Sequence, residues 1–354
     1  MQTSLADVAR MRLVSQRLVD PLDGVVEAVG HLTCTQGQDY PGSTVSLALR
    51  TTGRSAAEVR AAYDSGRIVR SWPMRGTLFV VAAEDLGWIG GLTAEKTRRA
   101  TTRRRDELGL SPDLLDRAES VAREALSGGG LTRAELLARW QDAGIATHGG
   151  RGYHHLFHLA VAGLVCQGPT QGREQRFVLT SEWIRTPRRV DREDGVRELL
   201  YRYICARGPV PVEDFCWWSK LGKVEVRGHL TDLADAGDVV TTHVEDRPYW
   251  MSPDLPDRYA TWRRATAAPL LLPGFDEIVL GYGDRRAVLS EDEERRVVPG
   301  GNGVFKGTVL HRGRGVGTWK KATKAGAPVD VTPFDTLPSP VVNAVPRLSA
   351  ALPT

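Results

Sequence analysis

The stretch GGGLTRAELLARWQDAGI, residues 128–145, decides the fold class of this sequence. Thr132 is followed three residues later by Glu135, which is the pattern of a capping box at the N-terminus of a helix. Apolar residues as far as Trp140 then recur on one helical face, as they do in a helix that packs against a core. The stretch therefore predicts a capped, amphipathic helix.

The residues that follow complete a larger pattern. A second helix is predicted in RGYHHLFHLAVAGLV, residues 151–165, with its end at Ala162-Gly163. Two short strands, LVCQG and RFVLT, then flank the polar turn PTQGREQ. The order helix, turn, helix and two-stranded hairpin is that of a winged helix.

The same order of elements occurs twice more along the chain. After residue 190, two predicted helices are followed by the strand DVVTTH, the turn VEDR and the strand PYWMS. Nearer the N-terminus, a capping box from Ser55 to Glu58 opens a helix that precedes two strands around the turn PMRG. Three winged-helix units in tandem are therefore predicted.

The remaining segments connect and close these units. The charge-rich helical sequence AEKTRRATTRRRDELGLSPDLLDRAESVAREAL lies between the first and second units. The predicted fold class is mainly α with small β-wings, which makes an α+β protein. The predicted divisions are residues 1–125 (first winged helix with the charged helical extension), 126–186 (second winged helix), 190–255 (third winged helix) and 256–354 (a β-rich segment with a hairpin and a closing helix).

Composition limits what the protein can be. The 354 residues are 41% hydrophobic and 25% charged, and no apolar run is long enough to span a membrane. The four cysteines show no CxxC spacing, so neither a disulfide framework nor a zinc site is indicated, and a cytoplasmic protein is expected. The formal net charge is +4, with 40 arginines and 7 lysines. Arginine suits phosphates and base edges, although a G+C-rich genome would give the same bias.

Two histidines and a glycine-rich run raise the question of a bound metal or phosphate. His154 and His158 are four residues apart on a predicted helix, but no third metal ligand is evident. Histidines in a core or on a groove-facing helix are the simpler interpretation. The run VPGGNGVFKG lacks the spacing of a phosphate-binding loop and precedes a strand, so a turn is predicted. Neither a cofactor nor a metal is expected.

Two glutamines flank one glycine in HLTCTQGQDYPG, residues 31–42. The glycines and the proline of this stretch predict that the preceding apolar helix ends here. In an extended or turn conformation, residues two apart such as Gln36 and Gln38 can point the same way. By itself, a Q-x-Q tripeptide carries almost no information about function.

With other blocks of sequence, the two glutamines carry a resemblance to a known family. The blocks VVEAVGHLTCTQGQDYPG, VRSWPMRGTLFVVAAEDLGWI, LLPGFDEIVLGYGDRRAVLS and RRVVPGGNGVFKGTVLHRGRGVGTWKK resemble, in this order and over nearly the whole chain, the AlkZ-type DNA glycosylases. That family consists of tandem winged helices with a Q-x-Q motif and cuts alkylated bases from DNA. The resemblance implies that Gln36 and Gln38 are catalytic. The middle residue of the family motif is usually apolar, whereas this sequence has Gly37.

The resemblance also implies a reaction and a partner. The expected enzyme is a monofunctional DNA glycosylase that hydrolyses the N-glycosidic bond of N7-alkylated purines, including bulky or crosslinked ones, for DNA repair or for self-resistance to a DNA-alkylating natural product. Its partner would be double-stranded DNA carrying alkylated purines, and a monomer is expected. Because catalytic amides must meet water and sugar, both glutamines are expected to be accessible. It stays open whether a carboxylate acts as a stronger base beside the glutamines. Four are candidates, although a structural role is the simpler explanation for each: Asp39, Asp276, Glu277 and Asp284.

Basic residues in the first wing and in the C-terminal hairpin are the candidates for phosphate contacts: Arg70, Arg75, Lys306, Arg312 and Arg314. Two other functions remain open at this point. A non-catalytic winged-helix DNA-binding protein, such as a transcriptional regulator, would have the same fold and charge. A protein-interaction scaffold would share the winged helices, since fold alone does not fix function.

Overall fold

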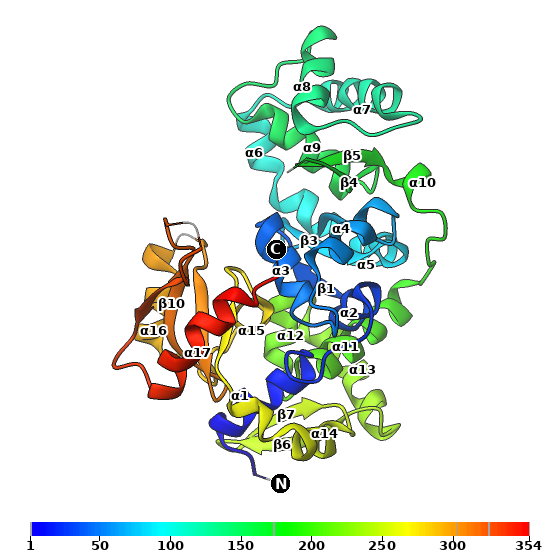
Figure 1. Ribbon diagram of the computed structural model, residues 1–354. Coiled ribbons are helices and arrows are strands. Elements are labelled where there is room, and N and C mark those ends of the chain that lie inside the picture. The colour runs from blue at the N-terminus through cyan, green and yellow to red at the C-terminus, as the bar shows by residue number, and fades with distance from the viewer. Residues whose placement is uncertain (1, 173, 302, 325, 354) are drawn as a thin grey trace. The chain divides into compact units, whose positions relative to one another are not determined.

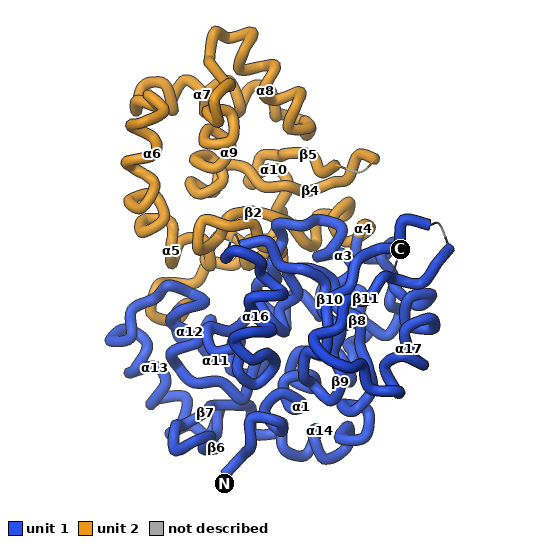
Figure 2. The backbone as a smooth tube through the Cα atoms, turned by 90° about the vertical axis from the view of Figure 1, so that its left-hand side faces the viewer, with its two compact units in different colours: residues 1–59, 196–354 blue, residues 60–195 orange. Residues whose placement is uncertain are grey.

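The computed structural model describes residues 2–172, 174–301, 303–324 and 326–353 (Figure 1). Helices and small antiparallel sheets alternate along the chain, which confirms the predicted α+β class. The chain forms two compact units, which Figure 2 colours separately. Unit 1 consists of residues 1–59 and 196–354, and unit 2 consists of residues 60–195. The division into four consecutive segments stays a prediction.

Unit 2 contains the hairpins of the first two predicted wings. Its helices are α5 (Leu86–Ala100), α6 (Thr102–Glu107), α7 (Pro112–Leu126), α8 (Arg133–Asp142), α9 (Arg151–Val161) and α10 (Thr180–Trp183). Its strands are β2 (Ile68–Met74), β3 (Thr77–Ala82), β4 (Val165–Gln171) and β5 (Glu174–Leu179). In the sheet, β3, β2, β4 and β5 are neighbours in this order, and β2 meets β4 where Arg70 lies opposite Gln167. The two hairpins therefore belong to one antiparallel sheet.

The helices of unit 2 pack around a core that includes Trp140 of α8. The predicted capping box is confirmed, because the N–H of Thr132 donates to Oε2 of Glu135 at 2.7 Å and the N–H of Glu135 donates back to Oγ1 of Thr132 at 3.3 Å. Trp140 is fully buried, and its indole N–H donates to the carbonyl of Ala118 in α7 at 2.9 Å. The helix α7, which ends the first predicted segment, thus shares its core with α8 and α9.

Unit 1 contains the third helix pair, its wing and the C-terminal sheet. Its helices are α1 (Leu5–Ser15), α2 (Val25–Leu32), α3 (Tyr40–Ala48), α12 (Val212–Ser219), α13 (Lys223–Asp235), α14 (Leu255–Trp262), α15 (Glu277–Leu280), α16 (Glu291–Val297) and α17 (Ser339–Ala350). Its strands are β1 (Cys34–Gln36), β6 (Val240–Val244), β7 (Arg247–Met251), β8 (Leu270–Leu272), β9 (Gly307–His311), β10 (Arg314–Lys320) and β11 (Asp330–Pro333). The chain passes between the units in α4 (Ala56–Asp64) and α11 (Arg192–Arg207).

The C-terminal segment forms an antiparallel sheet in the order β11, β10, β9, β8. The predicted hairpin is confirmed as β9 and β10, and the predicted closing helix is α17. The two residues of the hairpin turn, Arg312 and Gly313, have φ values of 54° and 78°. A Cβ atom on Gly313 would lie 2.8 Å from the carbonyl carbon of Ala9, so this turn requires glycine for space as well as for conformation.

Each helix pair is accompanied by a short extended segment that the sequence analysis missed. Leu131, just before α8, pairs with Phe177 of β5, and Val210, just before α12, pairs in the same antiparallel way with Trp250 of β7. In the first repeat, β1 holds the corresponding place before α3. The order helix, short strand, two helices and hairpin therefore occurs three times, and the first short strand ends at Gln36.

A partly buried histidine makes the stability of unit 1 dependent on pH. His31, at the end of α2, is hydrogen-bonded through Nε2 to the carbonyl of Ser15 at 2.7 Å. Burial lowers the pKa of His31 from its ordinary value of 6.5 to about 4. The unfolded chain therefore binds this proton at a higher pH than the folded chain does, and the stability that neutral His31 provides is lost as the pH falls from about 6.5 to about 4.

We expect His31→Gln to flatten this pH dependence, because glutamine keeps an N–H donor for Ser15 but does not titrate. The measurement is the free energy of unfolding in urea at pH 7.5, 6 and 5 for both proteins. A variant that loses as much stability between pH 7.5 and 5 as the wild type would show that His31 is not responsible.

Candidate active site

The two glutamines lie where a helix gives way to a strand. Helix α2 ends at Leu32, and Thr33 has a φ of 65°, a conformation that cannot continue a helix. The chain is then extended through β1, and Pro41 occupies the first turn of α3. The prediction that the helix ends ahead of the motif is confirmed.

The two side-chain amides meet each other. Nε2 of Gln36 donates to Oε1 of Gln38 at 3.3 Å, and the N–H of Gly37 donates to Oε1 of Gln36 at 2.9 Å. Gln38 is exposed, whereas Gln36 is only 5% exposed. The expectation that both amides are accessible is therefore wrong for Gln36, which is the last residue of β1 and is buried there. Gln38 is the amide that a large substrate can touch.

The backbone of the motif is fixed by a carboxylate from far along the chain. The N–H of Gln36 donates to Oε1 of Glu277 at 2.8 Å. The other oxygen of Glu277 accepts a hydrogen bond from Nη2 of Arg207 at 2.7 Å, and both side chains are buried. Burial by itself lowers the pKa of Arg207, but the Glu277 carboxylate outweighs it, so the pKa of the guanidinium is raised.

Arg207 also binds the chain directly ahead of the motif. It donates to the carbonyl of Leu32 at 2.9 Å and to the carbonyl of Cys34 at 2.7 Å, and its guanidinium carbon lies 4.6 Å from the ring centre of Trp218. The guanidinium thus holds both ends of the turn from α2 into β1. The Arg207–Glu277 ion pair fixes the position from which the Gln36 side chain projects.

A second buried ion pair ties helix α3, which follows the motif, to the same region. Arg50 donates to both oxygens of Asp276, each at 2.9 Å, and Ser46 donates to Oδ2 of Asp276 at 2.6 Å. Oδ1 of Asp276 also caps α15 by accepting from the N–H of Ile278 at 3.0 Å. Burial raises the pKa of Asp276, but Arg50 and these hydrogen bonds outweigh it and leave the pKa lowered. Asp276 is therefore ionised and structural.

The four candidate carboxylates thus occupy different environments. Asp276 and Glu277 are buried and paired, and Asp284 accepts hydrogen bonds from the backbone and side chain of Arg286. Asp39 is half-buried, directly follows Gln38, and makes no side-chain hydrogen bond at the start of α3. A Cβ atom on Gly42 would lie 2.3 Å from the Asp39 carboxylate, so glycine provides the space for this side chain. Asp39 is the carboxylate placed beside the accessible amide.

The predicted phosphate-binding residues are dispersed. Arg70 of β2 donates to Oε1 of Gln175 at 2.8 Å, and Arg75 lies in the turn between β2 and β3. In the C-terminal hairpin, exposed Lys306 precedes β9 while exposed Arg312 lies in the turn at the other end of that strand. Arg314 donates to the carbonyls of Arg286 and Ala287 at 2.8 and 3.3 Å. The structure therefore gives Arg314 a role inside the protein that the sequence did not indicate.

The two histidines considered as metal ligands, His154 and His158, both lie on α9. Among the described residues, no group of three or more histidines, cysteines, aspartates or glutamates could hold an ion. Burial and then nearby arginines lower the pKa values of His154 and His158. Both side chains are accordingly neutral at pH 7.

Comparisons with known proteins agree with this geometry. A protein-family model described as DNA glycosylase AlkZ-like matches residues 29–352. The interstrand DNA cross-link repair glycosylase of Streptomyces sahachiroi is 26% identical over 335 residues, which cover 92% of this chain and 88% of that protein. The solved structure of the Streptomyces sahachiroi DNA glycosylase AlkZ has a TM-score of 0.79 at 24% identity, covering 100% of this chain and 98% of that one. At that identity, the structural likeness shows the fold.

These matches define the class of the protein, which is an enzyme that hydrolyses N-glycosyl bonds in DNA. Within that class, the chain belongs to the AlkZ-like DNA glycosylase family. Family membership sets aside the two non-catalytic alternatives, the regulator and the scaffold. In the part of the chain that the structure describes, no helix is long and apolar enough to cross a membrane.

Proposed function

We propose that this protein is a monofunctional glycosylase for N7-alkylated purines in double-stranded DNA, including bulky or crosslinked adducts. It would act as a monomer in DNA repair or in self-resistance to a DNA-alkylating natural product. Support for crosslinked purines comes from the relative that is named an interstrand DNA cross-link repair glycosylase.

The chemistry of such a lesion explains why two amide side chains are sufficient for catalysis. Alkylation at N7 makes the purine cationic, so the base leaves as a neutral molecule and needs little acid catalysis. The enzyme must hold a water molecule against C1′ and stabilise an oxocarbenium-like transition state. Both tasks are positioning tasks, which a fixed hydrogen-bonding group performs well.

The coupling of the two amides is the observation that carries this proposal. The Gln36 amide is oriented by the N–H of Gly37, and it orients Gln38 through the 3.3 Å hydrogen bond. Oε1 of Gln38 keeps a second lone pair for the attacking water, and its NH₂ group keeps donors for a sugar or phosphate oxygen. In this arrangement Gln38 meets the substrate, and Gln36 holds it in place.

The proposal is tested on a duplex that carries N7-alkylguanine at defined positions. After incubation with the protein, heating in alkali should break the strand at each abasic site, in excess of the spontaneous background. An undamaged duplex of the same sequence is the control. Strand breaks no more frequent than in buffer would contradict the proposed substrate.

Two arginines in hairpin turns, the half-buried Arg75 and the exposed Arg312, are expected to bind DNA phosphates. Arg75→Gln and Arg312→Gln should each weaken DNA binding, most strongly at low salt, and reduce the slope of log K against log salt by about 1. Arg314→Gln is a matched comparison, because its guanidinium is held by two carbonyls and its loss should lower thermal stability instead. The measurements are fluorescence anisotropy at several salt concentrations and thermal unfolding. An unchanged salt slope in the first two variants would place the DNA-binding surface elsewhere.

A further inference from the structure

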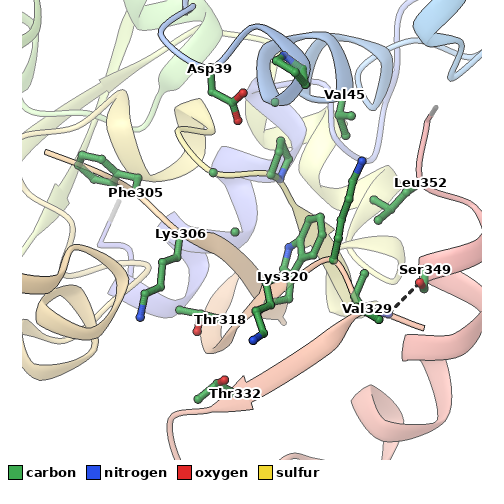
Figure 3. A pocket seen from close by; sticks show the side chains of 18 of the residues that line it. Asp39, Val45, Phe305, Lys306, Thr318, Lys320, Val329, Thr332, Ser349 and Leu352 are labelled. Atoms are coloured by element: carbon green, nitrogen blue, oxygen red, sulfur yellow. Dashed lines mark hydrogen bonds between the residues drawn. The ribbon is translucent and has the colours of Figure 1, made fainter. Parts of the chain in front are cut away.

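A pocket of 890 Å³ opens beside the motif, wholly within unit 1 (Figure 3). One side is formed by Asp39 and the start of α3, and the other sides are formed by the C-terminal sheet and the end of the chain. Asp39 directly follows Gln38 in sequence, so the pocket lining includes the residue next to the accessible amide. Pockets that hold drug-sized molecules have volumes of about 300–1,000 Å³.

The chain has seven lysines, and four of them line this pocket: Lys306, Lys320, Lys321 and Lys324. Figure 3 shows Lys306, just ahead of β9, and Lys320, at the end of β10, across the pocket from Asp39. In a chain with 40 arginines, more than half of the lysines thus gather at one site. A lysine carries its charge on a flexible stem, so it can follow ligands of variable shape where the planar fork of arginine cannot.

These lysines have no partners in the part of the chain that the structure describes. None of them makes an ion pair or a side-chain hydrogen bond there, whereas most exposed arginines of helices α5 to α7 are paired with glutamates. Among the described residues that line the pocket, Asp39 is the only one with a side-chain carboxylate. Four ammonium groups around one space repel each other, and an occupant that accepts hydrogen bonds or carries negative charge relieves that repulsion.

Most of the rest of the lining is apolar, apart from Thr318, Thr332 and Ser349. Val45, Phe305, Trp319 and Leu352 contribute to the walls, and the indole N–H of Trp319 is held by the carbonyl of Leu272 at 2.6 Å, which fixes the plane of its ring. Such walls suit a planar or aliphatic group more than they suit a bare phosphate. The pocket therefore combines mostly apolar walls with four lysines and, among its described residues, one side-chain carboxylate, Asp39.

We propose that this pocket receives the substituent of the alkylated base, and that it selects bulky, partly planar substituents that are neutral or anionic and rich in hydrogen-bond acceptors. The proposal rests on the proposed glycosylase function. The cationic purine lies beside Asp39 and Gln38, and the substituent extends toward the lysines. A substituent with a cationic tail is disfavoured, because it meets four ammonium groups.

The first test measures selectivity. Duplexes are prepared with guanine N7 carrying a methyl group, a monofunctional aryl mustard with a carboxylate, or the same mustard with an ammonium group. The kcat/KM ratio of the carboxylate adduct to the methyl adduct should fall roughly tenfold in the Lys320→Gln/Lys324→Gln double variant, as expected for two lost charge-assisted hydrogen bonds. Thr332→Trp, which fills the pocket from an exposed position on β11, should lower the same ratio. Lys223→Gln, on exposed α13 outside the pocket, should leave it unchanged.

The selectivity test has two outcomes that overturn the proposal. If the lysine variant slows all three substrates equally and reduces the salt slope of DNA binding, the lysines hold backbone phosphates instead. If the wild type prefers the ammonium adduct to the carboxylate adduct, the electrostatic selection is wrong.

A second test does not require glycosylase activity. The aromatic anion 1-anilinonaphthalene-8-sulfonate should bind the full-length wild type with a rise in fluorescence, and roughly tenfold more weakly to the double variant. If the protein cleaves no adduct but binds the probe in this lysine-dependent way, the proposed function fails and the pocket's preference for aromatic anions stands. If it cleaves adducts while probe binding is the same in both proteins, the pocket proposal fails alone.

Discussion

Gln38→Ala is expected to slow the release of N7-alkylguanine by roughly 10²-fold, the usual effect of removing one preorganised hydrogen-bonding group. Gln36→Ala should slow it by a comparable factor, because Gln38 loses the donor that orients its carbonyl. The double variant should be little slower than either single variant, since the two amides act as one unit. The measurement is the single-turnover rate of abasic-site formation, with affinity for undamaged DNA as the control. Strictly multiplicative effects of the two substitutions would show that the amides act independently.

Gln36→Glu separates orientation from base strength. The carboxylate keeps the shape of the side chain and can still accept from Gly37, but it has no donor for Gln38. We therefore expect Gln36→Glu to be as slow as Gln36→Ala. A variant that is faster than the wild type would show that a stronger base was limiting and that the positioning argument is wrong.

Glu277→Ala is expected to cost about 3–5 kcal/mol of the free energy of unfolding, because it leaves the Arg207 guanidinium buried and uncompensated. The measurement is urea unfolding at pH 7. Glu213→Ala is the matched control, since Glu213 forms exposed ion pairs with Lys223 and Arg247 and should cost under about 1 kcal/mol. Equal losses in the two variants would contradict the structural importance of the buried pair.

Glu277→Gln tests the same residue with a substitution that should disturb folding less than Glu277→Ala does. Its amide oxygen can still accept from the N–H of Gln36, but its charge no longer balances Arg207. If Glu277 positions the motif, the rate of base release should fall while affinity for undamaged DNA is retained. A variant that is destabilised but reacts at the wild-type rate would limit Glu277 to stability.

Local sequence patterns predicted the parts of the fold that depend on neighbouring residues. The capping box from Thr132 to Glu135, the C-terminal hairpin and the end of α2 before the motif all follow from side chains within a few positions of each other. The extended segments at Leu131 and Val210 were missed, because a single paired residue produces no alternation that a sequence can reveal.

The supports of the motif could not be predicted for a different reason. Glu277 and Arg207 are separated by 70 residues, and Glu277 and Gln36 by 241, so no spacing rule relates them. The resemblance drew attention to Glu277 only as a spare base, whereas its buried pairing with a guanidinium gives it a supporting role. The pocket was also missed, because Lys306 is 14 residues from Lys320 in sequence and only the fold brings them to one site.

The interruption of unit 1 by unit 2 has a consequence for synthesis on the ribosome. Unit 2 is continuous in sequence, so its core can form once its last residue has emerged. Gln36 is made early, but its carboxylate partner follows 241 residues later, a delay of roughly 10–50 s at ordinary translation rates. During that time the apolar residues of α1 lack α14, against which they pack in the folded protein, and the nascent N-terminal segment is a target for chaperones until the C-terminal half arrives.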